Sequence, residues 1–378
     1  MRFLFASDSF KGTLSSQKTA ELLTRAAKEI FPDCACAAVT VADGGEGTTD
    51  AVLSAVKGET IRLTVNGPLW EPTQSTYAIL EDGRAVMEMA AASGLPLVAE
   101  KDKNPLETTT YGTGEMIRDA LDRGCRDISI AIGGSATNDG GMGCVRALGV
   151  RFLDADGKEL EGRGKDLAKI SRIDLSGMDP RVKESRFTVM CDVTNPLCGP
   201  EGATYTYGKQ KGGTPERLEE LEAGMCHYRD LLKEIFGTDM DQVPGAGAAG
   251  GLGAALMAFF GGQLRSGIET VLDLIGFDKR LEGVDLVVTG EGAADWQSVF
   301  GKVMQGVGSH CKAFGIPAVA IVGSMGPGAE DIFDHGIVSI MTTVNGVMSL
   351  NEALSRADEL YLSTARRLFR LLRAGKAL

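Results

Sequence analysis

Histidine and paired cysteine, the side chains from which most zinc sites are built, are scarce or scattered in this chain of 378 residues. The three histidines lie far apart, at positions 227, 310 and 335, and the eight cysteines form no Cys-x-x-Cys pair. This spacing argues against a zinc cluster, and a chain of this length does not need a disulfide framework. Free thiols are typical of a reducing compartment, so we predict a cytoplasmic protein.

Positive charge is also in deficit. There are 39 lysines and arginines against 51 aspartates and glutamates, which gives a formal net charge of −12. Nucleic acids and anionic membrane surfaces require a basic face, so we expect no nucleic acid and no membrane among the partners. A small anionic substrate is compatible with this charge, because it needs only local donors.

Long apolar runs are missing as well. The longest uncharged stretch, residues 242–264, contains seven glycines and Pro244, and a membrane helix would tolerate only one or two of these. We interpret this stretch as a glycine loop followed by a short buried helix. The apolar part of residues 1–6 is too short for the core of a secretion signal, so we expect no targeting segment.

Strands and helices alternate at both ends of the chain. Apolar residues recur with helical spacing over residues 15–31, and residues 318–322 have the continuous apolar character of a buried strand. The middle of the chain differs, because Asp82 and Gly83 separate two apolar runs in the manner of a hairpin. Further expected elements are a charged helix at 215–236, a short helix at 329–335 and one closing helix at 350–372.

These patterns predict an α/β fold in two parts. Residues 1–60 and 285–378 are expected to form a discontinuous, Rossmann-like domain with a parallel sheet. Residues 61–284 are expected to form a second, mixed α/β domain inserted into the first.

Glycine-rich loops with polar side chains follow five of the predicted strands. They begin at Asp8, Asp43, Gly133, Asp192 and Gly290. In open parallel sheets, ligands bind beyond the carboxyl ends of the strands. Backbone amides of glycine loops bind phosphate, and aspartate oxygens hold Mg²⁺. A single loop of this kind is as readily a turn or a helix cap, but five together favour a phosphoryl-transfer site.

The residue types alone leave the individual roles open. Ser9, Lys11 and the glycine amides suit contacts with an anion, and either Asp8 or Asp192 suits the orientation or deprotonation of a hydroxyl group. The candidates for metal or ribose contacts are Asp43, Glu46, Glu291 and Asp295.

Rival motifs are absent or incomplete. The chain has no G-x-x-x-x-G-K-[ST] phosphate loop, no protein-kinase motif set and no G-x-S-x-G. Residues 245–250 match G-x-G-x-x-G, but no convincing strand precedes them, so a dinucleotide-binding dehydrogenase is a weak alternative. These glycines are expected to permit close packing of a helix or to donate amides to a ligand.

The loops resemble those of the bacterial glycerate kinases, and the resemblance runs in order through nearly the whole chain. The matching stretches are residues 8–15 (DSFKGTLS), 41–48 (VADGGEGT), 133–141 (GGSATNDGG), 192–197 (DVTNPL), 202–203, 207–212 (YGKQKG), 247–251 (GAAGG) and 289–292 (TGEG), with Asp295, Gln297, Gly301 and Lys302.

The resemblance implies two α/β domains with the active site in the cleft between them. It also implies ATP with Mg²⁺, and D-glycerate as the phosphoryl acceptor at its 2-hydroxyl. The same residues are compatible with a 3-kinase that gives 3-phosphoglycerate, and a homodimer is one expected assembly. The family usually has arginine where this chain has Ala293, so a non-catalytic regulator that responds to a nucleotide or sugar acid is a further alternative.

Candidate residues are assigned on the matching loops. The catalytic candidates are Asp8, Lys11 and Asp192. The substrate-binding candidates are Ser9, Ser135, Asn138, Asp139, Asn195 and Lys211. The candidates for nucleotide or phosphate binding are Gly44, Gly45, Gly250, Gly251, Gln297 and Lys302. The candidate metal ligands are Asp43, Glu291 and Asp295.

Overall fold

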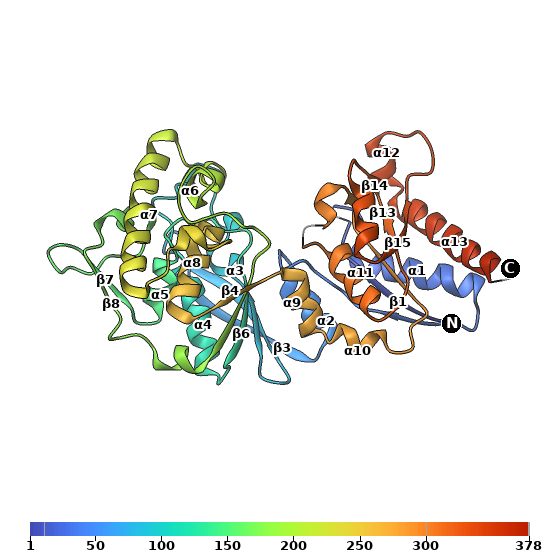
Figure 1. Ribbon diagram of the computed structural model, residues 1–378, viewed down its shortest axis with the longest axis horizontal. Helices are drawn as coiled ribbons and strands as arrows, with labels where there is room; N and C mark the ends of the chain where they lie inside the picture. Colours follow the sequence, from blue (N-terminus) through green and yellow to red (C-terminus); the bar gives the residue numbers. More distant parts are fainter. Residues whose placement is uncertain (11, 300, 377–378) are drawn as a thin grey trace. The chain divides into compact units, whose positions relative to one another are not determined.

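The computed structural model describes residues 1–10, 12–299 and 301–376, apart from the side chain of Gln297. The chain forms two compact units (Figure 1). The first unit contains Met1–Asp43, Asp50–Val56 and Gly267–Leu378, and the second contains Gly44–Thr49 and Lys57–Ser266.

A five-stranded parallel sheet forms the centre of the first unit, with the strand order β15-β13-β11-β1-β2. Its strands are β1 (Arg2–Ser7), β2 (Ala35–Ala38), β11 (Leu286–Gly290), β13 (Ala318–Val322) and β15 (Ile337–Thr342). A small parallel pair is formed by β12 (Ala293–Ala294), which follows β11 in the chain, and β14 (Ser324–Met325), which follows β13. The helices are α1 (Ser16–Ile30), α2 (Thr48–Ala55), α9 (Gly267–Leu274), α10 (Phe277–Leu281), α11 (Val303–Ala313), α12 (Leu350–Ser355) and α13 (Ala357–Gly375), with 3₁₀ helices η7 (Trp296–Val299) and η8 (Ala329–His335).

The core of this unit follows from the apolar strands and the amphipathic helices. Helix α1 begins where Ser15 Oγ accepts a hydrogen bond from the backbone N–H of Lys18, at 3.1 Å, which satisfies one of the free amides at a helix start. Helices α1 and α13 bury their apolar faces against β1, where the Phe3 and Phe369 rings lie 5.1 Å apart. Helix α11 packs against β11 and β13.

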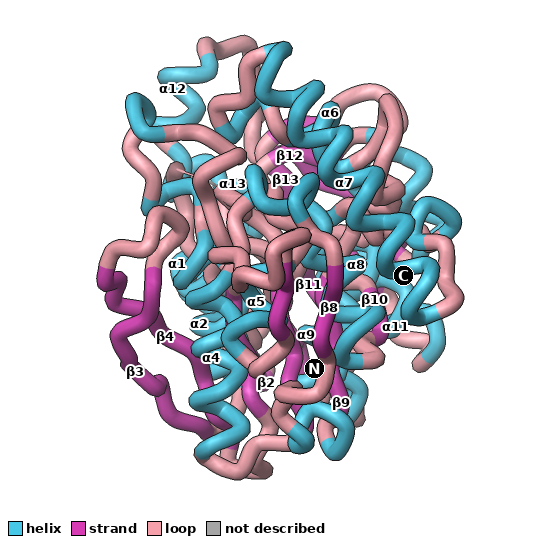
Figure 2. The backbone as a smooth tube through the Cα atoms, turned by 90° about the vertical axis from the view of Figure 1, so that its left-hand side faces the viewer, coloured by secondary structure: helices cyan, strands magenta, loops and turns pink. Residues whose placement is uncertain are grey.

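A six-stranded mixed sheet forms the centre of the second unit, with the strand order β10-β9-β6-β5-β4-β3. Its strands are β3 (Gly58–Asn66), β4 (Pro72–Leu80), β5 (Ala85–Glu88), β6 (Asp127–Ala131), β9 (Arg186–Met190) and β10 (Gln263–Arg265). The pairs β3–β4 and β4–β5 are antiparallel, and the remaining pairs are parallel. Figure 2 shows β3 and β4 running side by side as a long hairpin.

Helices and short turns cover this second sheet. The helices are α3 (Ala90–Ser93), α4 (Tyr111–Asp122), α5 (Met142–Ala147), α6 (Ala203–Tyr207), α7 (Pro215–Phe236) and α8 (Ala248–Phe260). The 3₁₀ helices are η1 (Leu95–Leu97), η2 (Glu100–Asp102), η3 (Gly164–Lys169), η4 (Pro180–Glu184), η5 (Lys209–Lys211) and η6 (Met240–Gln242). A separate hairpin joins β7 (Arg151–Leu153) to β8 (Arg172–Asp174).

The predicted α/β class, with one parallel sheet and a second mixed sheet, is confirmed. The Asp82-Gly83 turn joins β4 to β5 as expected. The single closing helix predicted over 350–372 is wrong, because Arg356 leaves the helical conformation (φ −109°, ψ 18°) and divides α12 from α13. The short helix expected at 329–335 is a 3₁₀ helix.

The compact units differ from the predicted domain boundaries in three places. Residues 44–49 and 57–60 belong to the second unit, and residues 267–284 belong to the first. The last difference has a visible cause, since His310 on α11 bonds to Glu269 on α9 and to Asp278 on α10.

No described helix has both the length and the apolar character that a bilayer crossing requires.

The contacts of His310 predict how the stability of the first unit depends on pH. Hydrogen bonds to Glu269 (3.0 Å) and Asp278 (2.6 Å) outweigh burial and raise the pKa of His310 to about 9. An unfolded histidine has a pKa of about 6.5. The stabilisation is therefore complete below about pH 6.5 and is lost as the pH rises towards 9.

We expect the thermal midpoint of the protein to fall between pH 6.5 and pH 9, and His310→Gln to lower it at pH 6 and to flatten this fall. His335→Gln serves as the control, because no ion pair is described for His335 within the part of the chain that the structure covers. An equally steep fall in His310→Gln would contradict the assignment.

Candidate active site

A pocket of about 410 Å³ lies in the first unit, beyond the carboxyl ends of β1, β11, β13 and β15. This is the edge of a parallel sheet at which ligands bind. Polar residues of its lining include Asp8, Ser9, Asp43, Glu291 and Lys302. Apolar residues that precede α1, follow β15 or lie in α12 also line it; among them are Leu14, Val344, Leu350 and Leu354.

Close contact between neighbouring strands brings these polar groups together. The backbone N–H of Asp8 donates to the carbonyl of Gly290, at 2.9 Å, and so ties the end of β1 to the end of β11. Position 290 admits only glycine, because a Cβ there would lie 1.8 Å from the carbonyl oxygen of Ile321 on β13. Glu291 follows directly and therefore emerges beside Asp8.

Glu291 is a buried carboxylate among other charges. Its side chain is 7% exposed, and the Ser298 hydroxyl donates to its Oε1 at 2.5 Å. Burial raises the pKa of Glu291, and the nearby negative charges of Asp8 and Asp295 act in the same direction, whereas Ser298 and Lys302 oppose it.

A divalent cation at this place would relieve the repulsion between the carboxylates. Oxygen ligands are those that Mg²⁺ prefers. The carboxylates of the predicted ligands Asp43, Glu291 and Asp295 therefore fit the predicted cation.

The predicted residues of the first unit are only partly described. Asp8, Ser9, Asp43, Glu291 and Lys302 line one pocket, and Asp295 acts electrostatically on Glu291. Lys11 lies outside the described residues. Gln297 lies in η7, and its side chain is likewise outside the description. Ala293, the position at which the sequence departs from the family pattern, is exposed and lines the same pocket.

A second group of predicted residues surrounds the loop after β6 in the second unit. Lys211 is 2% exposed, and its ammonium group donates to Ser135 Oγ at 2.9 Å and to the carbonyl of Thr137 at 2.6 Å. Burial lowers the pKa of Lys211 to about 7, against the opposing attraction of Asp139. The buried lysine therefore stabilises the loop that contains Ser135 and Thr137.

Asp139 is fully buried and is surrounded by donors. The backbone N–H and the hydroxyl of Thr110 both donate to its Oδ2 at 2.7 Å, and the amides of Gly141 and Gly143 donate at 3.1 Å. Burial raises the pKa of Asp139, whereas these four hydrogen bonds favour the carboxylate and act in the opposite direction. Its described contacts join the start of α4 to the start of α5.

The same loop packs against the glycine turn at the start of α8. Gly250 has φ +67°, and a Cβ there would lie 2.1 Å from the carbonyl of Thr137. A Cβ at Gly251 would lie 2.8 Å from Gly140 Cα, and the amide of Gly140 donates to the carbonyl of Gly250 at 3.0 Å. The expectation that these glycines permit close packing is therefore confirmed.

The loop after β9 reaches the same turn. The amide of Gly247 donates to the carbonyl of Asn195 at 3.0 Å. The side chain of Asn195 donates to the carbonyl of Glu201 at 2.7 Å and accepts from the Tyr207 hydroxyl at 2.6 Å. Asp192, at the start of this loop, is exposed. The loops after two neighbouring parallel strands, β6 and β9, thus meet at one glycine turn.

Sequence reasoning missed Glu88, at the end of β5. Its carboxylate accepts from the amides of Gly47 at 3.1 Å and Thr49 at 2.8 Å. This anchors the loop that carries Gly44 and Gly45, and Gly45 in turn lies near Gly133, because a Cβ at Gly133 would be 3.9 Å from its Cα. The sequence did contain a signal for Glu88, because it is a carboxylate at the end of a predicted strand, as are several of the predicted site residues.

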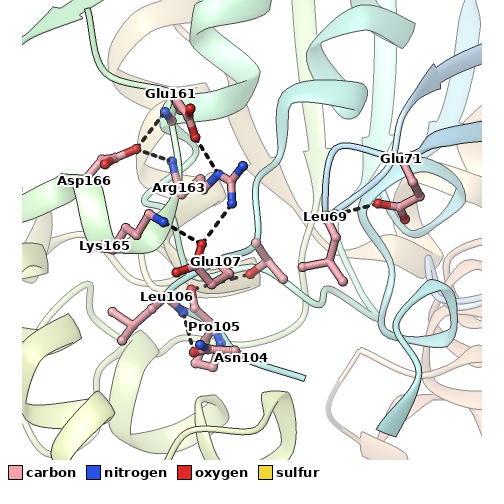
Figure 3. A network of polar contacts seen from close by, with 12 residues as sticks. Leu69, Glu71, Asn104, Pro105, Leu106, Glu107, Glu161, Arg163, Lys165 and Asp166 are labelled. Atoms are coloured by element: carbon pink, nitrogen blue, oxygen red, sulfur yellow. Dashed lines mark hydrogen bonds and ion pairs between the residues drawn. The ribbon is translucent and has the colours of Figure 1, made fainter. Parts of the chain in front are cut away.

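A polar network supports the segment that leads to Thr110. Glu107 accepts from Arg163 at 2.9 Å and from Lys165 at 2.6 Å, and Asp166 accepts from the amide of Arg163 at 3.2 Å (Figure 3). Burial alone would raise the pKa of Glu107, but the two cations outweigh it and lower that pKa. The network therefore holds Glu107, three residues before Thr110, whose amide and hydroxyl donate to Asp139.

These features define an α/β protein of the phosphotransferase type, with carboxylates and a lysine at the strand ends of one unit and glycine-rich polar loops in the other. The model of the glycerate kinase family matches residues 3–373. The chain belongs to the glycerate kinase family, as the loops predicted, and is therefore an enzyme of the kinase class.

Individual relatives are similar in sequence to this chain over nearly their whole length. The chain is 43% identical to the glycerate 2-kinase of Escherichia coli (strain K12) over 376 residues, 99% of each protein. It is 44% identical to a glycerate kinase of Bacillus cereus over 367 residues, 97% of this chain and 96% of the relative. A crystal structure of a Salmonella typhimurium LT2 protein, assigned as glycerate kinase 2, matches all of both chains with a TM-score of 0.89 at 42% identity.

The contact between Gly250 and Thr137 can be tested with two alanine substitutions, one in α8 and one at its C-terminal cap. Gly261, the cap, has the same left-handed backbone conformation (φ +66°) but no atom within 4 Å of an added Cβ. Gly261→Ala should therefore destabilise the protein only by the left-handed strain that it introduces, roughly 1–2 kcal/mol. Gly250→Ala adds overpacking of roughly 1–3 kcal/mol.

Denaturant unfolding of the two variants measures the difference. We expect Gly250→Ala to be clearly the less stable variant. Equal stability of the two would mean that the close approach to Thr137 does not constrain the loop.

Proposed function

We propose that this protein transfers the γ-phosphoryl group of ATP to the 2-hydroxyl of D-glycerate and forms 2-phospho-D-glycerate. The observation that carries the proposal is the acidic pocket at the strand ends of the first unit, in a chain that belongs to the glycerate kinase family throughout. The position of transfer is supported by the name of the Escherichia coli relative, glycerate 2-kinase.

The pocket of the first unit suits a nucleotide. Its apolar lining residues, which include Leu350 and Leu354, offer a surface for a flat base. Its polar lining residues offer carboxylates for a cation and Lys302 for phosphate charge. We assign Asp43, Glu291 and Asp295 to Mg²⁺, with Lys302 and Gln297 beside the phosphates. When bound, Mg²⁺ would neutralise phosphate charge.

The loops of the second unit suit the small acid. Ser135, Asn138 and Asn195 supply hydroxyl and amide groups for a carboxylate and two hydroxyls. Asn138 Oδ1 is buried and, within the described residues, has no hydrogen-bond partner, so it can accept from a ligand. We assign Asp139 and Lys211 to holding these loops, because both side chains are buried and are hydrogen-bonded to the loop segments around them.

The reaction requires no covalent bond between the protein and the substrates. Phosphoryl transfer depends mainly on alignment of the two substrates and on neutralisation of the developing charge. We assign Ser9, Lys11 and the amides of Gly44, Gly45, Gly250 and Gly251 to anion contacts. Asp192 or Asp8 orients the acceptor hydroxyl and takes its proton.

The proposal also includes a cytoplasmic location and a homodimeric assembly. All eight cysteines lie within the described residues and are free thiols, which supports a cytoplasmic location. A homodimer would be recognised by its mass in light scattering.

Activity measurements test the catalytic assignment. With D-glycerate and Mg-ATP, the wild-type protein should release ADP, and enolase alone should consume the product, whereas 3-phosphoglycerate would require an added mutase. Asp192→Asn and Lys11→Ala should each lower turnover at least roughly a hundredfold, the usual scale for acid–base and charge-stabilising groups. The exposed pair Asp156→Asn and Lys101→Ala provides matched controls.

Near-normal turnover in both variants would remove these two residues from the mechanism without affecting family membership. Binding of D-glycerate and ATP without ADP release would instead favour the regulator, for which Ala293 is the specific observation. Absence of NAD binding in a thermal-shift assay would remove the dehydrogenase.

The metal assignment has its own test. Glu291→Gln should raise the Mg²⁺ concentration for half-maximal rate by at least about tenfold, because one carboxylate charge is lost from the pocket. Glu330→Gln, an exposed change in the same unit, should leave it unaltered. The Mg²⁺ dependence of the initial rate measures both, and an unchanged dependence in Glu291→Gln would exclude Glu291 as a ligand.

A further inference from the structure

Two thiols and a carboxylate converge in the second unit, where the loop that follows β9 leads on to Cys198. Among the described residues, the ligand atoms of Cys198, Glu222 and Cys226 all lie within 4.8 Å of one another. Glu222 and Cys226 are four residues apart on α7 and therefore share one face of the helix. Cys198 comes from the segment that follows β9.

The three residues are held in place by the surrounding backbone. The amide of Gly199 donates to Glu222 Oε1 at 2.6 Å, and the Cys226 thiol approaches the same oxygen at 3.7 Å. The amide of Cys198 donates to Asp241 Oδ1 at 2.9 Å, and Arg229 pairs with the other oxygen of Asp241 at 2.7 Å. The arrangement therefore does not depend on a bound ion for its position.

One atom of the cluster lacks a partner. Glu222 is 9% exposed, and its Oε2 is buried with no hydrogen-bond partner in the part of the chain that the structure describes. An unsatisfied buried carboxylate oxygen is unfavourable by more than an unsatisfied neutral group. A cation bound between the thiols and this carboxylate would satisfy it.

We propose that Cys198, Glu222 and Cys226 bind a thiophilic divalent cation of the Zn²⁺ class, with water in a fourth position. Thiolate ligands select soft or borderline ions, whereas Mg²⁺ and Ca²⁺ prefer oxygen. Three protein ligands with one open position are a common zinc arrangement. The site is separate from the pocket that we assign to Mg-ATP and does not depend on the proposed function.

Binding has an electrostatic requirement. Burial raises the pKa of both thiols, so they are protonated before the ion arrives and the ion must displace their protons. Asp241 and Glu222 oppose the ionisation of Cys198 by their negative charge. Glu222 also opposes that of Cys226, whereas Arg229 favours it.

An ion at this site would tie two parts of the second unit together. The segment that starts at Cys198 continues through Glu201, whose carbonyl accepts from Asn195, into α6 and then to Lys211. Helix α7 carries the other two ligands. An ion that binds only the folded protein stabilises it, so the effect should appear as greater stability of the second unit.

Cobalt titration of the full-length protein tests the site, because Co²⁺–thiolate charge-transfer absorption reports sulfur ligation directly. Reduced, chelator-treated protein should bind one Co²⁺ per chain with this absorption, and Zn²⁺ should displace it. Cys226→Ser should weaken binding by at least ~100-fold, the upper end of the loss seen even for residues that only support ligands. Glu222→Gln should also weaken it.

The chain offers a matched control in Cys34 and Cys36. Their sulfur atoms lie 3.5 Å apart, and no carboxylate completes a three-residue cluster with them among the described residues. The double change Cys34→Ser and Cys36→Ser should leave the Co²⁺ spectrum intact. Zn²⁺ should raise the thermal midpoint of the wild type and of this control, but not of Cys226→Ser.

Three results would overturn the proposal. One is the absence of thiolate absorption in the reduced wild type. Another is absorption that survives in the double variant Cys198→Ser, Cys226→Ser but is lost in the Cys34, Cys36 control. The third is a thermal midpoint of the wild type that Zn²⁺ does not raise. Circular dichroism of Glu222→Gln, which keeps both thiols, separates loss of the site from loss of folding.

Discussion

The candidate site depends on how closely backbone segments approach one another at the ends of parallel strands. At Gly290 and at Gly250 an added Cβ would clash with a neighbouring carbonyl oxygen, at 1.8 Å from Ile321 O and 2.1 Å from Thr137 O. Both glycines therefore let two backbone segments approach where larger residues would hold them apart. The polar groups that follow, Glu291 in one unit and Asn138 in the other, owe their positions to this contact.

Burial of charge is the second consequence of that close packing. Lys211 and Asp139 are enclosed by the protein, and each is retained by hydrogen bonds that replace water. Glu291 is enclosed in a different way, because other carboxylates act on it, and among the described residues Ser298 and Lys302 offset them. The first two therefore stabilise loops, whereas the third leaves an excess of negative charge that suits a cation.

The sequence predicted helices and strands most accurately where the local residue pattern and the burial of the segment favour the same structure. The strand at 318–322 and the helix at 215–236 have the predicted bounds, because a continuous apolar run and a capped amphipathic repeat each specify one structure. The break at Arg356 and the hairpin of β7 and β8 were not predicted, since arginine is not a helix breaker and each strand of the hairpin has only three residues. The hydrogen-bond partners of Lys211 and Asp139 were also out of reach, because they are distant in the chain.

The amino-acid sequence by itself determined the α/β class, the glycine-rich loops at the strand ends and the family, since these follow from short-range patterns and from the order of motifs. Only the tertiary structure decided which of those loops meet, that Glu88 anchors one of them, and that Cys198 lies beside Glu222 and Cys226. The physical reason is that contacts between residues far apart in the chain depend on how strands pair and helices pack, which no local spacing records.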